Sequence, residues 1–271
     1  MKYALVNNAK LEATKGSRGI CPYCRAELIA KCGEYKIHHW AHTSKGNCDP
    51  WWERETDWHR LWKGNYPEKW QEIVFRDSTS GEKHIADVQT DHGLTIEFQH
   101  SNINSEERKA REQFYKNLVW IVDGTRLNSD FPRFLLGSKK FKSSGKQGLY
   151  FVDLLDKNFP INWKDCAVPV IFDFKVLNEL TGNDKFRDNL YCLFPDKVKH
   201  YNILAIISRT TFIDSTKNGT WLKWYLNFVG KSNAGLKADE LSQEKQTPKK
   251  AVRPRTADII VKGRFKRRSR L

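Results

Sequence analysis

Two acidic residues and a glutamine stand in one short run whose pattern predicts a β-hairpin. The run from His84 to Gln99 reads HIADVQTDHGLTIEFQ, with apolar and polar residues alternating on both sides of residues 91–93. Gly93 can adopt the positive φ of a tight turn. A three-residue loop there places Asp87 opposite Glu97, about 5 Å away. Facing carboxylates repel unless a cation separates them, so the pattern predicts a site for Mg²⁺ or Mn²⁺. The alternative is a surface hairpin with ordinary exposed acids.

The flanking segments predict the elements that hold this hairpin. Residues 51–64 are rich in tryptophan and charge and predict a helix, and residues 72–76 predict a strand followed by a turn at 77–81. A second helix is expected over residues 104–117, because Asn104 can cap it and Glu107 follows three residues later. Residues 118–123 then predict a buried strand. The expected order is αβββαβ.

This order and the D…E-x-Q signature resemble the PD-(D/E)XK nuclease superfamily, whose fold is an α/β (α+β) restriction-endonuclease-like core. More closely, residues 1–125 resemble the CoiA-like competence nuclease family. The motifs that carry the resemblance are Cys21-Pro-Tyr-Cys24, His39-Trp-Ala-His42, Glu55-x3-His59-x3-Lys63, Ala86-Asp87-Val88 and Ile96-Glu97-Phe98-Gln99-His100-Ser101, followed by Glu106, Arg108, Arg111, Tyr115 and Trp120. In the superfamily a lysine often follows the second acid, and here Gln99 stands in its place.

The resemblance implies a metal-dependent nuclease. Asp87 and Glu97, with the Phe98 carbonyl, would hold one or two Mg²⁺ or Mn²⁺ ions, which activate water and stabilise charge at the scissile phosphate. Gln99 projects from the same strand face as Glu97 and would orient the water. It cannot act as a base.

Three more residues recur on one predicted helix face. Glu55, His59 and Lys63 are spaced i, i+4 and i+8. Glu55 is the expected third carboxylate, His59 a proton carrier, metal ligand or DNA contact, and Lys63 a phosphate contact. A solvated stripe of modest ion pairs is the alternative.

The second predicted helix adds basic and aromatic residues. Arg108, Arg111 and Tyr115 are spaced i, i+3 and i+7 and could line the path of a nucleic acid. Each could equally be a surface residue, and Tyr115 could close the core.

A cysteine and histidine pattern precedes the hairpin. Cys21 and Cys24, followed by His39 and His42, have the spacing of a tetrahedral structural zinc site. His38 and Cys48 are rival ligands. With Cys21 and Cys24 in such a site, fewer cysteines remain to pair, so we expect a reducing cytoplasm rather than a disulfide framework.

The charge of the chain points to an anionic partner. The formal net charge is +15, which favours nucleic acid over membrane. Residues 231–271 hold 13 Lys and Arg against 4 Asp and Glu, a net +9. They predict a disordered arm that binds phosphates, through Arg264, Lys266, Arg267 and Arg268 among others; a tail that only aids solubility is the alternative. No run reaches transmembrane length, and the first residues lack a signal-peptide core.

These features divide the chain into four expected parts. They are a zinc-finger-like module (1–50), the nuclease core (51–125), a mainly β module (126–230) and the basic tail (231–271). Within the third part, strands are expected near 149–154, 168–174, 190–194 and 203–207, turns at 157–160, 182–184 and 195–196, and a helix at 221–229.

The leading functional prediction is a metal-dependent deoxyribonuclease, expected to be an endonuclease, that serves DNA uptake and recombination or attacks foreign DNA such as that of phage. One alternative is a nucleic-acid-binding adaptor that has lost cutting, with Gln99 as its main support. Another is a scaffold that recruits a helicase, recombinase or defence protein. A homodimer would allow both strands of a duplex to be cut.

Overall fold

The structure is a computed structural model that describes residues 1–44, 48–153, 155–176 and 185–227. These residues form a mixed α+β fold with two sheets. Among them, no helix has the length and apolar character needed to cross a bilayer. The basic tail predicted at 231–271, with Arg264, Lys266, Arg267 and Arg268, lies outside the described residues, as does the turn predicted at 182–184.

The first sheet is built from antiparallel hairpins near the N-terminus. Its strands are β1 (Tyr3–Val6), β2 (Ala9–Glu12), β3 (Arg18–Ile20), β4 (Glu27–Lys31) and β5 (His39–His42), in the order β2-β1-β3-β4-β5. Asn7 and Asn8 both have positive φ and close the β1–β2 hairpin, the conformation that a two-residue loop favours. Ala4, Leu28 and Trp40 form the centre of its small core.

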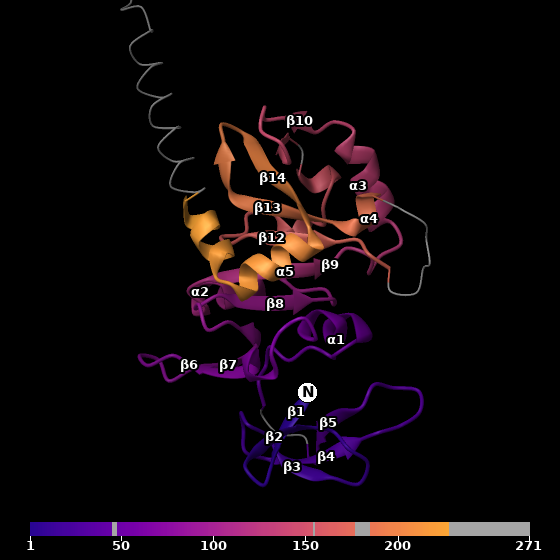
Figure 1. Cartoon of the computed structure of the whole chain (residues 1–271), viewed down its shortest axis with the longest axis vertical. Helices are drawn as coiled ribbons and strands as arrows, with labels where there is room; N and C mark the ends of the chain where they lie inside the picture. The colour runs from indigo at the N-terminus through magenta and orange to yellow at the C-terminus, as the bar shows by residue number, and fades with distance from the viewer. Residues whose placement is uncertain (45–47, 154, 177–184, 228–271) are drawn as a thin grey trace, which may run out of the picture. The chain divides into compact units, whose positions relative to one another are not determined.

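The second sheet has nine strands (Figure 1). They are β6 (Gln71–Arg76), β7 (Lys83–Gln89), β8 (Thr95–Gln99), β9 (Leu118–Asp123), β10 (Lys142–Ser143), β11 (Leu149–Val152), β12 (Val170–Asp173), β13 (Asn189–Val198) and β14 (Tyr201–Ser208). Their order in the sheet is β10-β11-β14-β13-β12-β9-β8-β7-β6, with β8, β9 and β12 parallel to one another.

This sheet continues from the predicted nuclease segment into residues 126–230. Strand β12 pairs with β9, and Ile171 lies opposite Ile121. The segment expected to be a separate β module is therefore an extension of the same sheet. The turn expected at 195–196 is wrong, because Pro195 lies inside β13, where the register shifts between Leu193 and Lys197. A proline fits such an irregularity because it cannot donate a ladder hydrogen bond.

Helices cover both faces of the nine-stranded sheet. They are α1 (Asp57–Lys63), α2 (Ser105–Phe114), α3 (Asp130–Ser138), α4 (Lys185–Asp188) and α5 (Arg209–Lys217), with short 3₁₀ turns η1 (Glu68–Trp70), η2 (Leu155–Lys157) and η3 (Ile161–Trp163), and residues 220–227 are also helical. Successive residues of β9 face opposite ways. Ile121 packs in one core with Trp58 of α1 and Phe212 of α5, and Trp120 packs in the other core with Phe134 of α3.

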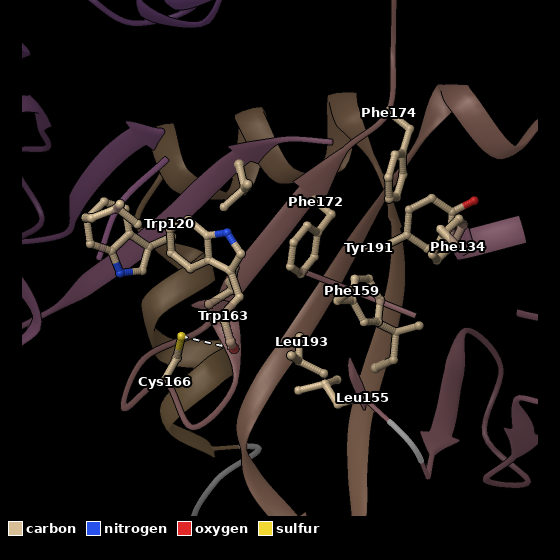
Figure 2. Packing of buried hydrophobic residues seen from close by; sticks show 14 of the residues in the cluster. Trp120, Phe134, Leu155, Phe159, Trp163, Cys166, Phe172, Phe174, Tyr191 and Leu193 are labelled. Carbon is tan, nitrogen blue, oxygen red and sulfur yellow. Dashed lines mark hydrogen bonds between the residues drawn. The ribbon is translucent and has the colours of Figure 1, made fainter. Parts of the chain in front are cut away.

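Figure 2 shows the second of these cores in detail. Trp120 and Trp163 meet edge to face, with ring centroids 5.4 Å apart. Phe134 lies 4.6 Å from Phe174 and 4.4 Å from Tyr191, centroid to centroid. These aromatic side chains thus hold β9, α3, η3, β13 and the end of β12 against one another.

The predicted hairpin has the expected register near its turn. Gln89 pairs with Thr95, the Thr90 amide donates to the Leu94 carbonyl at 2.9 Å, and Gly93 has φ +81°. The regular ladder ends at Val88 and Ile96, one residue before Asp87 and Glu97.

Helix α1 is shorter than the predicted helix over residues 51–64. The Thr56 side chain accepts from the His59 amide and forms the N-cap, so the helix begins at Asp57. Glu55 therefore precedes the helix rather than sharing its face. Helix α2 follows the prediction more closely, because the Asn104 side chain accepts from the Glu107 amide at 2.7 Å.

Candidate functional site

Asp87 and Glu97 occupy the point where strands β7 and β8 separate. The Asp87 amide donates to Glu97 Oε1 at 3.2 Å, and the Phe98 amide donates to Asp87 Oδ2 at 3.0 Å. Each side chain thus replaces a backbone bond of the ladder. Both line a small cavity of about 60 Å³. The hairpin brings the two predicted carboxylates together, as expected.

Lys63 reaches into this cluster from α1. Its Nζ lies 2.9 Å from Asp87 Oδ1, 3.3 Å from Glu72 Oε1 and 3.4 Å from Glu55 Oε1. Although burial lowers the pKa of Lys63, the carboxylates raise it well above its ordinary value. Lys63 therefore stays charged and supplies, from a helix, the positive charge that Gln99 cannot supply from the strand.

Glu72 of β6 is a site residue that the sequence analysis missed. Its backbone has φ +47°, and its carboxylate accepts hydrogen bonds from the Lys2 amide at 2.8 Å and the Tyr3 amide at 3.0 Å. Burial would raise the pKa of Glu72, but Lys63 and these amides lower it to about 2. Glu72 is thus a fixed anion that ties β1 of the first sheet to the acidic cluster.

Glu97 has an unusual environment. Burial, reinforced by the charge of Asp87, raises the pKa of Glu97 to about 8. Arg111 opposes this shift, since its Nη1 donates to Glu97 Oε2 at 3.2 Å while its Nη2 donates to the Trp51 carbonyl at 2.6 Å. A second positive charge in the site would favour the ionised carboxylate further.

The three α2 residues expected to contact nucleic acid are buried instead. Arg111 pairs with Glu97, Arg108 donates to Glu112 Oε1 at 2.6 Å, and Tyr115 is 3 % exposed in the hydrophobic core. Arg108 itself is only 1 % exposed. The expectation is wrong for all three because this face of α2 packs onto the sheet, and the alternative role of Tyr115 in the core is the one observed.

Gln99 is held next to the cluster by a second missed residue, Glu53. Gln99 Nε2 donates to Glu53 Oε2 at 2.8 Å, and the Ser101 amide donates to Glu53 Oε1. Gln99 Oε1 is buried and has no hydrogen-bond donor among the described residues. The sequence offered no signal for Glu53 beyond its place inside the predicted helix.

His59 connects α1 to β8. Its Nδ1 accepts from the Thr56 amide at 3.2 Å, so Nε2 carries the proton and donates to the Phe98 carbonyl at 3.1 Å. The carbonyl expected as a metal ligand is therefore already an acceptor for His59.

The residues around the small cavity suit a hard cation. Carboxylate oxygens are the donors that Mg²⁺ and Mn²⁺ prefer, and the cavity has room for about two water-sized groups. Both oxygens of Glu55 are buried without a hydrogen-bond donor in the described part of the chain. Arg60 Nε is 2.9 Å away, but its N–H does not point at the carboxylate.

A separate cluster of soft ligands lies in the first sheet. Cys21, Cys24, His42 and Cys48 place their ligand atoms within 4.8 Å of one another. The Sγ atoms of Cys21 and Cys48 are 3.8 Å apart, and Cys24 Sγ is 3.2 Å from His42 Nε2. Two sulfurs of a tetrahedral zinc with bonds of about 2.3 Å lie about 3.8 Å apart. The cluster can therefore hold a metal ion such as zinc.

His39 is not part of this cluster, so the predicted ligand set is wrong at one position. His39 and His42 lie three residues apart on β5, which directs their side chains to opposite faces. His39 Nδ1 lies 2.9 Å from the Ile37 carbonyl. Cys48, the rival ligand, takes the fourth position.

Comparison with known proteins identifies the first sheet. Residues 4–50 match the family model of the competence protein CoiA, N-terminal domain. The N-terminal segment is thus similar to CoiA, as its motifs predicted, and the matched segment contains all four residues of the soft cluster. No curated protein and no solved structure matches the chain.

Proposed function

We propose that this protein is a divalent-metal-dependent deoxyribonuclease of the PD-(D/E)XK type that acts as an endonuclease. The observation that carries the proposal is the set of carboxylates from Glu55, Asp87 and Glu97 around one small cavity, with Lys63 among them. The order α1, β6, β7, β8, α2, β9 agrees with such a core.

Each residue has a role that follows from its contacts. Asp87, Glu97 and Glu55 would hold Mg²⁺ or Mn²⁺, which supplies an activated water and offsets charge on the phosphate. Lys63, freed in part from Asp87 when an ion binds, stabilises negative charge that develops on the phosphate oxygens. Gln99 offers its free Oε1 to orient the water, and Glu53 fixes the amide by accepting from Nε2. His59 is a positioning residue that holds α1 against β8.

The CoiA-type domain supports a setting in DNA uptake and recombination. Attack on foreign DNA such as that of phage uses the same chemistry and is the other setting we propose. In the first, a recombinase or helicase is the expected partner, and in the second a defence protein. A cytoplasmic homodimer would present two such sites to a duplex.

A second function, DNA binding without cutting, has one specific observation in its favour. Lys63 and Arg111 already pair with Asp87 and Glu97, so part of the charge of the acidic cluster is offset before any ion binds. An adaptor could keep these residues as a structural ion-pair network.

Incubation with circular single-stranded and plasmid DNA, with and without Mg²⁺ or Mn²⁺, separates the two functions. We expect Asp87→Asn and Glu97→Gln to lower metal-dependent cutting by at least about 100-fold. Asp91→Asn is the matched control, because Asp91 is an exposed acid on the turn of the same hairpin, paired with Lys69. If wild type and Asp91→Asn cut DNA while Asp87→Asn and Glu97→Gln do not, the result supports the nuclease. DNA binding without cutting under every condition contradicts it and favours the adaptor.

A further inference from the structure

A groove of about 1440 Å³ adjoins the acidic cavity. The two spaces share a wall, since Asp49, Trp52, Glu53 and Glu55 line both. The groove is bordered on one side by the segment between β4 and β5 and by β5 itself, and on the other by residues 48–57 and by His100 and Ser101 after β8. Pockets for small ligands measure about 300–1,000 Å³, so this groove has the size for a polymer.

Two aromatic rings are exposed along this groove. Tyr35 is 97 % exposed and Trp52 is 56 % exposed. Neither lies on a strand: Tyr35 comes from the segment between β4 and β5, and Trp52 from the segment between β5 and α1. Exposed rings along a groove are the platforms on which unpaired bases stack, whereas paired bases in a duplex cannot reach them.

Two basic residues lie beside these rings, in a groove that Asp49, Glu53, Glu55 and Asp57 also line. Lys36 and Arg54 line the groove and are exposed, and neither has an ion-pair partner among the described residues. Arg60 differs, because it is engaged by Glu12 and Glu55. Uncommitted cations beside aromatic rings favour a phosphate backbone.

We propose that this groove binds single-stranded DNA, with bases stacked on Tyr35 and Trp52 and phosphates at Lys36 and Arg54. The strand passes the shared wall of Glu53 and Glu55, which brings one phosphate to the acidic cavity. This inference deepens the proposed nuclease function by naming its substrate as an unpaired strand, but the groove can bind DNA even if the acidic cluster cuts nothing.

Binding of a fluorescein-labelled oligothymidylate tests the inference, with fluorescence anisotropy measured without added divalent ion so that no strand is cut. We expect tighter binding of this strand than of a duplex of equal length. Trp52→Ala and Tyr35→Ala should each weaken binding by about 5- to 100-fold, the effect of losing one stacked base. Trp224→Ala, which removes an exposed tryptophan of the 220–227 helical segment, is the control and should bind as wild type does.

The charged residues give an independent readout. Lys36→Ala and Arg54→Ala should each lower the salt dependence of binding by about 0.7 in the slope of log K against log salt, and Lys109→Ala on the exposed face of α2 should not. Equal binding by the Trp52 and Tyr35 variants and wild type, or preference for duplex, overturns the inference. Preference for oligouridylate over oligothymidylate overturns its assignment to DNA.

Asp87→Asn separates this inference from the nuclease proposal. In this variant, Trp52→Ala and Tyr35→Ala should weaken oligothymidylate binding by the same factor as they do in the wild-type protein. Binding that depends on Trp52 and Tyr35 in a protein that never cuts DNA supports the groove and contradicts the nuclease. Metal-dependent cutting that is unaffected by Trp52→Ala and Tyr35→Ala supports the nuclease and contradicts the groove.

Discussion

The soft cluster and the acidic cluster of this protein differ in whether the chain itself places positive charge among the candidate ligands. The soft cluster joins three cysteines and a histidine from residues 21–48, a segment of one sheet. The acidic cluster gathers Glu55, Glu72, Asp87 and Glu97 from several elements and already contains the cations Lys63 and Arg111.

This difference separates two uses of a metal. A closed set of four soft ligands binds an ion as part of the fold. An acidic set that already contains two cations is partly neutralised without an ion, and under the proposed function it would bind an ion that can exchange. The comparison predicts a large stability effect at the first cluster, a smaller one at the second, and a graded pH effect at Glu97.

The largest expected effect is at the soft cluster. Structural zinc contributes about 10–16 kcal/mol to the folding of zinc-finger peptides, so Cys48→Ser should lose the single zinc per chain and unfold the first sheet. His39→Gln should keep both, because His39 faces away from the cluster. Atomic absorption and near-UV circular dichroism measure the two properties. Equal zinc loss in both variants would contradict the ligand set.

A smaller effect is expected at Lys63. Lys63→Met leaves Asp87, Glu72 and Glu55 without their shared cation, which should cost about 3–5 kcal/mol in the metal-free protein. Mn²⁺ should restore more stability to this variant than to wild type, because the ion takes over the role of the lysine. Urea denaturation with and without Mn²⁺ measures both effects.

Lys69→Met is the matched control for Lys63. Lys69 forms an exposed pair with Asp91, and such pairs contribute about 0–1 kcal/mol. If both substitutions had equally small effects, Lys63 would not be needed to offset the charge of the acidic cluster. The contrast between the soft cluster and the acidic cluster would then fail.

Within any one pH unit, the smallest effect is the pH dependence of the metal-free protein. Folded Glu97 keeps its proton up to a pKa of about 8, above the ordinary value of 4.5, so the unfolded chain releases this proton at lower pH. Stability should therefore fall as pH rises between about 4.5 and 8, by up to about 1.4 kcal/mol per pH unit. Glu97→Gln should lack this component. Urea midpoints from pH 5 to 9 that run parallel in both proteins would argue against a buried, protonated Glu97.

Local patterns in the sequence predicted the parts of the fold that depend on near neighbours. The hairpin register follows from Gly93 and the alternation around it, and the start of α2 follows from Asn104. Strand β9 matches the predicted residues because all six are apolar or buried at the sheet centre. The helix before β6 was predicted too long because Thr56, whose partner is His59, is a cap inside the predicted range.

The contacts of the site depend on the tertiary fold, which the sequence does not display. Glu72 joins the acidic cluster only because β1 brings the Lys2 and Tyr3 amides to it. The sequence pattern predicted Arg111 to lie on the surface or along a nucleic-acid path, yet α2 directs its side chain at Glu97. His39 was the one error that the sequence could have exposed, since strand parity on β5 already separates it from His42.

The pairing of β12 with β9 has a practical consequence for anyone who shortens this chain. A protein ended at residue 125 would contain every residue of the acidic cluster, but it would leave β9, whose six residues are all buried, as an open edge. Unprotected apolar edges pair with other chains and lead to aggregation. Insolubility of such a fragment would therefore reflect the absence of β12 beside β9. It would say nothing about the chemistry of the intact protein.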